Sequence, residues 1–208
     1  MSYAVKEIFL TLQGEGMQAG RRAVFLRFAG CNLWTGREQD RAAAQCNFCD
    51  TDFVGMDGEN GGRYEAAALA DRVAALWGEG PRPLVVVTGG EPLLQLDAPL
   101  IDALHARGFE IALETNGTLA APAGLDWICV SPKARTEIVQ RSGDELKLVW
   151  PQAGIDPGAL AGWNFRHLLV QPMDCEDREA ALAAAIDLVM KDPRWKLSLQ
   201  THKMLGLP

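Results

Sequence analysis

Three cysteines are the residues of this sequence whose types and spacing best suit chemistry. Cys46 and Cys49 form a CxxC pair, and fourteen residues separate Cys31 from Cys46. Three thiolates converging on one point suit a soft metal centre. A four-iron cluster usually takes four cysteines, so three would leave one iron open to bind a reactant. A structural zinc site and a redox CxxC pair are the alternatives, although a zinc site needs a fourth ligand and the nearest stretches contain no histidine.

A glycine-containing loop and a charged strand precede the cysteines. Residues 11–16 read TLQGEG, in which Gly14 and Gly16 indicate a tight loop. The apolar run 23–28 predicts a buried strand, and Arg27 interrupts it. A buried charge needs a partner. Arg27 is therefore either half of a structural ion pair or a binder for a substrate carboxylate, which its planar guanidinium fits.

Polar motifs follow most of the predicted strands. Short apolar runs predict buried strands at 23–28, 84–87, 110–113, 127–130, 146–150 and 167–170, and the alternating run 195–199 is a further candidate. Four of the runs lead into TGGEP (88–92), ETNGT (114–118), SPK (131–133) and QPMD (171–174). Each motif alone could be an ordinary turn, but four polar motifs at strand ends in one short chain favour a shared binding or active site over four unrelated turns.

The spacing of the apolar residues defines the expected fold. Helical periodicity predicts helices at about 64–77, 97–107 and 177–191. Short strands that end in polar loops indicate a parallel sheet with its site at the carboxyl ends. A full eight-unit barrel takes about 250 residues, and this chain has 208. We therefore expect an α/β fold: an incomplete, parallel-stranded TIM-like barrel of about six strands with three main helices, in a single domain over 1–208.

Composition narrows the function classes. The formal net charge of -7 argues against a nucleic-acid surface, which would be basic, so we expect a small-molecule substrate. The first residues show no signal peptide, and no apolar stretch approaches the ~20 residues of a membrane helix. The odd count of five cysteines fits a reducing cytoplasm better than a disulfide framework. Some of the six tryptophans could pack a homodimer interface, although core packing is their commoner use.

The cysteines and the TGGEP motif together resemble a known superfamily. A CxxC followed by Asp50 and Thr51, with VVVTGGEP downstream at 85–92, resembles the radical S-adenosylmethionine (SAM) superfamily. The first cysteine spacing departs from that pattern, with fourteen residues in place of three, because of an insertion around 36–45 in an extended loop at about 31–50. With TLQGEG, this variant closely resembles the 7-carboxy-7-deazaguanine synthase family of the queuosine pathway, from about Glu7 to Pro208.

The resemblance implies an activity and its cofactors. Members of this family are carbon–nitrogen lyases that convert 6-carboxy-5,6,7,8-tetrahydropterin to 7-carboxy-7-deazaguanine with loss of ammonia, by radical ring contraction. Cys31, Cys46 and Cys49 would hold a 4Fe-4S cluster whose open iron binds SAM. The radical would take hydrogen from C6 of the pterin and later return it, so SAM would not be consumed. An electron donor such as flavodoxin or ferredoxin would reduce the cluster.

The resemblance also implies roles for the strand-end residues. No side chain is expected to be catalytic, because the SAM-derived radical carries the chemistry. Contacts to SAM are expected from Phe48, Asp50, Gly89, Gly90, Glu91, Ser131, Pro132, Lys133, Gln171, Pro172, Met173 and Asp174. Contacts to the substrate are expected from Leu12, Gln13, Gly14, Glu15, Arg27, Thr88, His202 and Pro208, with Thr201 a further candidate.

Three positions and one ion complete the expected site. Glu114, Thr115 and Asn116 are equally well explained as SAM contacts or as a structural turn. Thr51 is similar to the family position that binds Mg²⁺ together with substrate oxygens. A hydroxyl alone is a weak ligand for Mg²⁺, so we expect weak magnesium binding without substrate.

Two other functions compete with this one. A radical SAM activating enzyme that generates a glycyl radical on a partner protein would share the cluster but lack a closed small-molecule pocket. A non-enzymatic zinc-binding interaction module would need neither the GGEP loop nor SAM.

Overall fold

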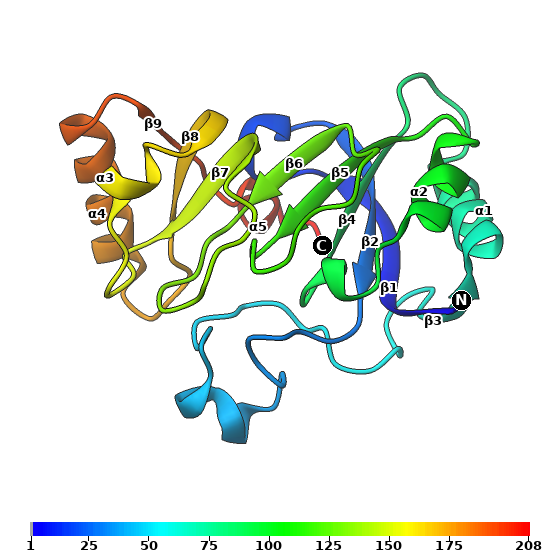
Figure 1. The fold of residues 1–208 in the computed structure, drawn as a ribbon, viewed down its shortest axis with the longest axis horizontal. Helices are drawn as coiled ribbons and strands as arrows, with labels where there is room; N and C mark the ends of the chain where they lie inside the picture. The colour runs from blue at the N-terminus through cyan, green and yellow to red at the C-terminus, as the bar shows by residue number, and fades with distance from the viewer. Residues whose placement is uncertain (1) are drawn as a thin grey trace.

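A single nine-stranded sheet runs through the computed structural model, which describes residues 2–208 (Figure 1). The order of the strands across the sheet is β3-β1-β2-β4-β5-β6-β7-β8-β9. Their bounds are β1 Ser2–Leu12, β2 Arg22–Phe28, β3 Gly62–Glu65, β4 Leu84–Gly89, β5 Glu110–Thr115, β6 Trp127–Val130, β7 Ser142–Trp150, β8 Asn164–Pro172 and β9 Trp195–Leu197.

The sheet is parallel from β2 to β9 and antiparallel at its β1–β3 edge. All six predicted strands are present and parallel, so the expected open, parallel sheet is confirmed, and the run at 195–199 contributes β9. Two strands were not predicted. Residues of β1 contain an apolar run that carries no clear strand boundary, and β3 is a four-residue edge strand that overlaps the start of the predicted first helix.

Three long helices cover the sheet, as predicted. They are α1 (Ala66–Trp77), α2 (Ala98–His105) and α4 (Arg178–Lys191), each within two residues of its expected bounds. The remaining helical elements are short: the helices α3 (Pro157–Leu160) and α5 (Thr201–Leu205) and the 3-10 turns η1 (Gly16–Gln18), η2 (Glu38–Ala43) and η3 (Pro92–Leu94). The carboxylates of Asp97 and Asp177 cap α2 and α4 by accepting backbone N–H bonds.

Two apolar clusters on the helix side of the sheet form the core. Side chains of β2, β4 and β5 pack against α1 and α2, and those of β7, β8 and β9 pack against α3 and α4. Because side chains alternate along a strand, Val24, Leu26 and Phe28 face this core. The intervening Phe25 and Arg27 face the opposite, concave side of the sheet, where the cavity lies.

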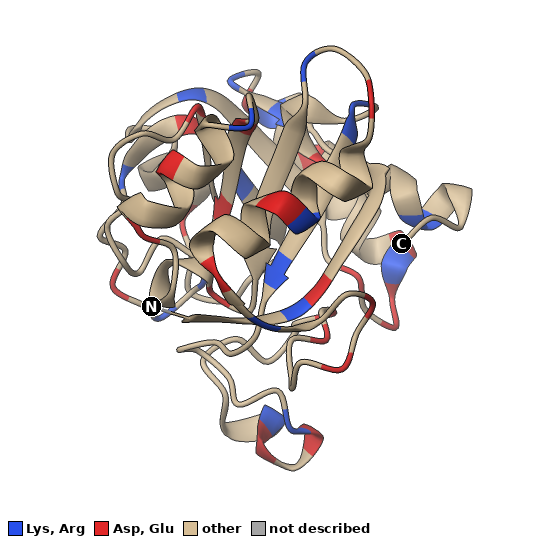
Figure 2. Ribbon diagram, turned by 90° about the vertical axis from the view of Figure 1, so that its right-hand side faces the viewer, with Lys and Arg blue, Asp and Glu red and all other residues tan. Residues whose placement is uncertain are grey.

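The chain between β2 and β3 forms a long loop that extends away from the sheet, with η2 at its tip (Figure 1). Acidic and basic residues are interspersed over the molecule rather than gathered by sign (Figure 2). Within residues 2–208, no helix is long and apolar enough to cross a membrane.

Candidate active site

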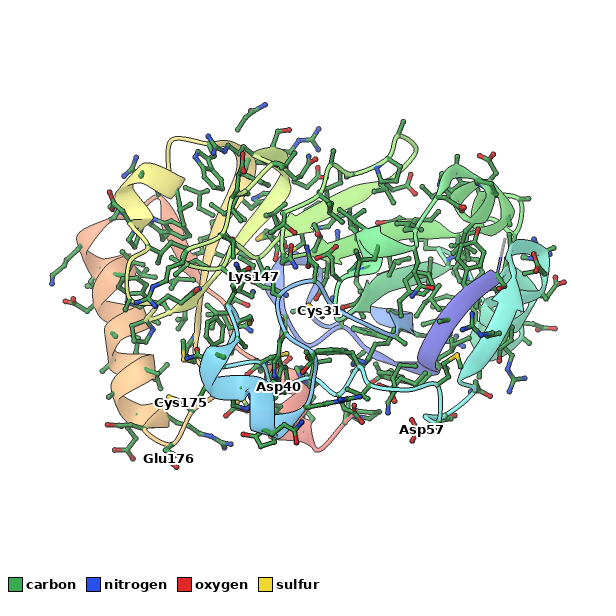
Figure 3. All side chains as sticks on the ribbon, turned by 60° about the horizontal axis from the view of Figure 1, so that its bottom comes forward. Cys31, Asp40, Asp57, Lys147, Cys175 and Glu176 are labelled. Carbon is green, nitrogen blue, oxygen red and sulfur yellow. The ribbon has the colours of Figure 1, made fainter. Side chains whose placement is uncertain are left out.

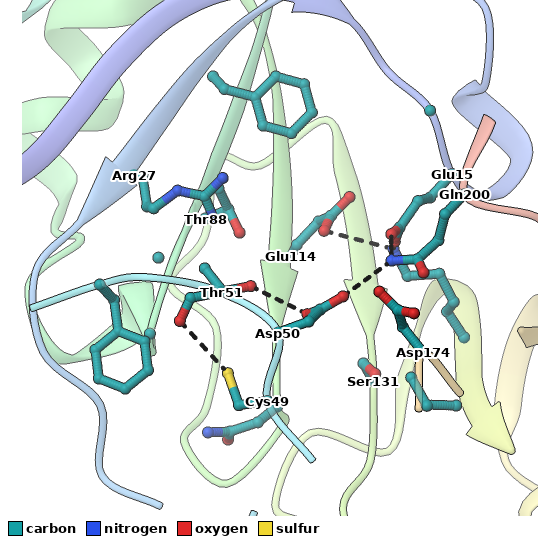
Figure 4. A pocket seen from close by; sticks show the side chains of 18 of the residues that line it. Glu15, Arg27, Cys49, Asp50, Thr51, Thr88, Glu114, Ser131, Asp174 and Gln200 are labelled. Carbon is teal, nitrogen blue, oxygen red and sulfur yellow. Dashed lines mark hydrogen bonds and ion pairs between the residues drawn. The ribbon is translucent and has the colours of Figure 1, made fainter. Parts of the chain in front are cut away.

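The carboxyl ends of the parallel strands surround one cavity of about 350 Å³. This volume lies in the range of pockets that bind small molecules. The walls come from β1, β2 and β4 to β8, the cysteine loop, the segment after β1 and the C-terminal residues (Figure 4). The sequence-predicted strand-end motifs therefore converge on a single site.

The three cysteines of the long loop line one end of this cavity. A hydrogen bond from Cys46 lowers the pKa of the Cys49 thiol to about 6, and Cys49 acts electrostatically on Cys31. Burial raises the pKa of Cys31. All five cysteines of the chain are free, so none of the three is used in a disulfide.

The donor set at this end of the cavity fits an iron–sulfur cluster. Leu33, Trp34 and Phe48 provide apolar walls beside the thiols. In residues 2–208, no group of three His, Cys, Asp or Glu side chains is arranged to hold a single metal ion. A four-iron cluster separates its thiolate ligands more widely than one tetrahedral ion does, and it takes thiolates. Three free thiols that line one cavity match the thiolate ligands of an iron–sulfur cluster.

The 36–45 insertion folds back onto the CxxC segment. Arg41 donates hydrogen bonds to the carbonyl oxygens of Asn47 (3.1 Å) and Cys49 (3.0 Å). Its guanidinium also lies 4.1 Å from the centre of the Trp34 ring. Arg41, a residue of the insertion, therefore stabilises the segment that carries Cys46 and Cys49.

The TGGEP motif brings β4 against the cysteine loop. Gly90 lines the cavity, and a Cβ atom at this position would collide with the carbonyl oxygen of Gly30 and with Cys31. Gly89 also lines the cavity. Only glycine lets the two backbones approach this closely.

Glu91, which sequence reasoning expected beside SAM, is fully buried beneath the cavity wall. Its carboxylate accepts hydrogen bonds from the Thr115 hydroxyl (2.8 Å), the Asn116 amide (2.8 Å) and the Leu93 amide (3.0 Å). Burial raises the pKa of Glu91. The structure thus places this carboxylate between the TGGEP and ETNGT motifs, where it joins them through hydrogen bonds. Thr115 and Asn116, which donate two of those bonds, also line the cavity.

The ends of β6 and β8 form the wall opposite β2. Ser131, Lys133, Gln171, Pro172 and Asp174 line the cavity, as do Phe48, Asp50 and Thr51 of the cysteine loop. Lys133 donates to the carbonyl oxygen (2.9 Å) and hydroxyl (2.7 Å) of Ser131. Of the residues expected to contact SAM, Pro132 and Met173 are the two besides Glu91 that lie outside the lining.

Eight residues expected to contact the substrate line the same cavity: Leu12, Gln13, Gly14, Glu15, Arg27, Thr88, His202 and Pro208. The further candidate Thr201 does not line it. Arg27 forms the structural ion pair that its sequence position allowed. Its Nε donates to Glu7 at 2.7 Å, and the side chain also borders the cavity. The lack of a side chain at Gly14 makes room for the ring of His202.

A buried ion network borders the same cavity. The Lys147 ammonium is 2.5 Å from a Glu15 oxygen and 3.4 Å from a Glu114 oxygen. Burial works to lower the pKa of Lys147, but the surrounding acidic groups, Glu114 and Glu15 foremost, together outweigh it and raise that pKa. Burial works to raise the pKa of Glu15, and Lys147 outweighs it and lowers that pKa.

The C-terminal segment forms one wall of the cavity. Gln200 donates to Glu15 (2.8 Å) and Asp50 (3.2 Å), as Figure 4 shows. Thr201 bonds the carbonyl oxygen of Gly14 through both its amide and its hydroxyl, at 2.9 Å each. Lys203 bonds Asp50 and Asp174, both at 2.6 Å. Segments from the two ends of the chain therefore meet at the site.

Sequence reasoning missed several residues that line the cavity: Glu7, Phe9, Phe25, Lys147, Gln200 and Lys203. The signal for Lys147 was present. It is a charge inside an apolar run, between Leu146 and Leu148, and is thus analogous to Arg27 in its own strand. No comparable pattern marks Gln200 or Lys203, because they belong to a short tail helix.

Comparisons with known proteins agree with this site. A family model described as the Radical SAM superfamily matches residues 39–144. The chain is 63% identical to the 7-carboxy-7-deazaguanine synthase of Caulobacter vibrioides and 61% identical to that of Bordetella pertussis, in each case over 100% of both chains. Its structure is similar to that of QueE from Escherichia coli, with a TM-score of 0.73 and 27% sequence identity over 96% of this chain and 94% of that chain.

Proposed function

The chain belongs to the 7-carboxy-7-deazaguanine synthase family of the radical SAM superfamily, and on this premise we propose that it converts 6-carboxy-5,6,7,8-tetrahydropterin to 7-carboxy-7-deazaguanine with loss of ammonia. This lyase reaction serves the biosynthesis of queuosine and related 7-deazapurines, a tRNA modification pathway. One observation carries the proposal. The three thiols and eight of the residues expected to bind the pterin line one and the same cavity.

The thiol end of the cavity suits the cofactors of this superfamily. Cys31, Cys46 and Cys49 would hold the 4Fe-4S cluster, and the strand-end residues beside them would hold SAM. When bound, these groups supply the 5′-deoxyadenosyl radical that exchanges hydrogen with C6 of the substrate. Gly89 and Gly90 expose backbone that can approach the methionine end of SAM closely. The apolar walls keep solvent away from the reacting groups.

The other end of the cavity suits a carboxylated pterin. The guanidinium of Arg27 can pair with the substrate carboxylate, and Thr88 beside it supplies a hydroxyl. Carboxylate and amide groups of Glu15 and Gln13 match the N–H donors and the carbonyl acceptor of a pterin edge. These residues bind and orient the substrate so that C6 faces the thiol end of the cavity.

Magnesium completes the proposed site. Thr51 borders the cavity with its hydroxyl 3.4 Å from an Asp50 oxygen. A cation held there by one hydroxyl needs substrate oxygens to fill its shell, so magnesium should bind weakly to the substrate-free protein. Tight binding of Mg²⁺ to that protein in a calorimetric titration would contradict this assignment.

We also infer the setting in which the enzyme works. The chain forms one domain that acts in the cytoplasm as a homodimer, receives electrons from a flavodoxin or ferredoxin, and binds neither nucleic acid nor membrane. The acidic balance of the chain supports a small-molecule substrate over a nucleic acid.

A turnover experiment tests the function. The protein is purified without oxygen, its iron and sulfide are reconstituted, and it is reduced and incubated with SAM and 6-carboxytetrahydropterin. The expected result is 7-carboxy-7-deazaguanine over many turnovers with SAM retained. Release of 5′-deoxyadenosine without this product would overturn the substrate and favour an activating enzyme of the same superfamily. A colourless, zinc-containing protein that leaves SAM intact would return the cysteines to a structural role.

A further inference from the structure

We propose that Lys147 is a positioning residue for the pterin substrate. It holds the carboxylate of Glu15 directly, and it holds the amide of Gln13 through Glu114. This inference rests on the proposed function, because it concerns the substrate end of the same cavity.

The strand pattern directs Lys147 toward the site. Leu146 and Leu148, its neighbours in β7, are fully buried in the core on the helix side of the sheet. Alternation therefore places the lysine side chain on the concave side, and Figure 3 shows Lys147 in the interior of the molecule. Its side chain is only 4% exposed, yet it borders the cavity.

Each carboxylate that contacts Lys147 is held at both of its oxygens. In Glu15, one oxygen accepts from Lys147 at 2.5 Å and the other accepts from Gln200 at 2.8 Å. In Glu114, one oxygen lies 3.4 Å from Lys147 and the other accepts from the Gln13 amide at 2.9 Å. Because both oxygens have a partner, neither carboxylate can rotate without losing a contact.

The same contacts fix Gln13. Its side-chain nitrogen donates to Glu114, and its side-chain oxygen accepts from the backbone amide of Glu15 at 3.0 Å. One buried cation thus organises a closed set of hydrogen bonds that includes both polar side chains of the QGE segment. Without the cation, two carboxylates would share a buried site with no opposite charge, and they would repel each other.

The chemistry of a pterin explains the need for this rigidity. Its pyrimidine edge presents N–H donors beside a carbonyl acceptor, so a carboxylate and an amide must lie at the correct angles to bind it. A charge-assisted hydrogen bond loses most of its strength when its geometry is lost. Lys147 acts on the substrate through Glu15 and Gln13, and it acts on substrate binding more than on the radical step.

The test compares Lys147→Met with Arg21→Met in reconstituted, dithionite-reduced enzyme at saturating SAM. Arg21 pairs with Glu110, at the start of the strand that carries Glu114, and it does not line the cavity. Lys147→Met should raise KM for the pterin by about tenfold to a hundredfold, the equivalent of one charge-assisted hydrogen bond, and change kcat by less than about threefold. Arg21→Met should leave KM unchanged. An unchanged KM in Lys147→Met, with kcat reduced in proportion to the folded fraction, would overturn the proposal.

A double variant separates positioning from charge balance and also covers a failure of Lys147→Met to fold. In Lys147→Met/Glu114→Gln, the buried charges are better matched, and the new amide oxygen can still accept from Gln13. This variant should have a higher melting temperature than Lys147→Met and keep the raised KM. A return of KM to the wild-type value would show that Lys147 only balances charge.

A binding measurement keeps this inference distinct from the proposed function. The dissociation constant of 6-carboxypterin, whose C6 carries no hydrogen, can be measured by fluorescence without any turnover. It should rise in Lys147→Met as KM does. Wild-type protein that binds this probe but makes no 7-carboxy-7-deazaguanine would refute the proposed reaction and leave Lys147 testable, whereas equal binding by wild type and Lys147→Met would refute the role of Lys147.

Discussion

Replacement of Glu91 tests whether this carboxylate supports the site or contacts SAM. Its side chain is fully buried and accepts three hydrogen bonds, from Thr115, Asn116 and Leu93. In Glu91→Ala, all three donors lose their acceptor inside the protein. Hydrogen bonds to a charged group contribute about 1.5–3 kcal/mol each. The cost of burying the carboxylate, which raises its pKa, offsets part of that sum.

We therefore expect Glu91→Ala to lower the free energy of unfolding by about 3–5 kcal/mol. For a chain of this size, that loss corresponds to a fall of roughly 6–20 °C in the melting temperature. Glu91→Gln keeps one acceptor but turns an amide N–H₂ toward at least one donor, so its cost should be about 1–3 kcal/mol. The ranking of the two variants follows from the number of donors left unpaired.

The assay is thermal unfolding of the cluster-free proteins without oxygen, followed by circular dichroism. The exposed Glu137 provides a matched control, because Glu137→Ala should leave the melting temperature within about 1 °C of wild type. Glu91→Ala within about 1 kcal/mol of wild type would refute the reasoning. A Glu91→Gln variant that keeps its melting temperature but loses SAM affinity would instead show that the carboxylate contacts SAM.

Three further predictions address the loop, the substrate and the pH dependence. Arg41→Met removes two hydrogen bonds to the CxxC segment, so it should destabilise that segment by about 1–3 kcal/mol and lower the iron bound per protein after reconstitution. Arg37→Met, at an exposed position of the same loop, should leave the iron content unchanged. Equal iron contents in the two variants would contradict the role of the insertion. Arg27→Lys keeps the charge but loses the planar fork, so KM for the pterin should rise about tenfold with little change in kcat, and an unchanged KM would limit Arg27 to its ion pair with Glu7. Burial raises the pKa of Glu145, so its contribution to stability is present below its unfolded pKa of about 4.3 and is lost as pH rises through the folded value. In urea unfolding, the free energy of unfolding of Glu145→Gln should accordingly rise relative to that of wild type as pH increases above about 4.3. A difference between the two proteins that stays constant across pH would refute this.

The parallel sheet was predictable because buried parallel strands give short apolar runs with distinct ends. All six such runs became strands, from β2 to β8, and the three long helices followed from their 3.6-residue periodicity. The strand β1 was not recognised because its residues mix apolar and polar types without turn residues at its start. The edge strand β3 is stabilised by pairing with β1, which no local pattern encodes.

The site was predictable where a motif ends a strand and not where tertiary contacts create it. Glycines, cysteines and Arg27 stand out in the sequence, and they line the cavity. Glu91 directly follows Gly89 and Gly90, which line the cavity, so its sequence position suggests the same location. Only the fold shows that Thr115 and Asn116 donate hydrogen bonds to its carboxylate instead. Gln200 and Lys203 reach Asp50 across a sequence separation that local reasoning does not span.

The contacts between α5 and the segment after β1 have a consequence for the order of folding. The bond from Thr201 to Gly14 joins residues 187 positions apart, whereas the cysteine segment is complete within the first quarter of the chain. Contacts of such long range form late, because the entropy of closing the intervening chain must be overcome first. During synthesis the cysteines therefore emerge well before the tail that covers the cavity. Iron and sulfide can therefore reach the cysteines during synthesis, before α5 has docked beside the cavity.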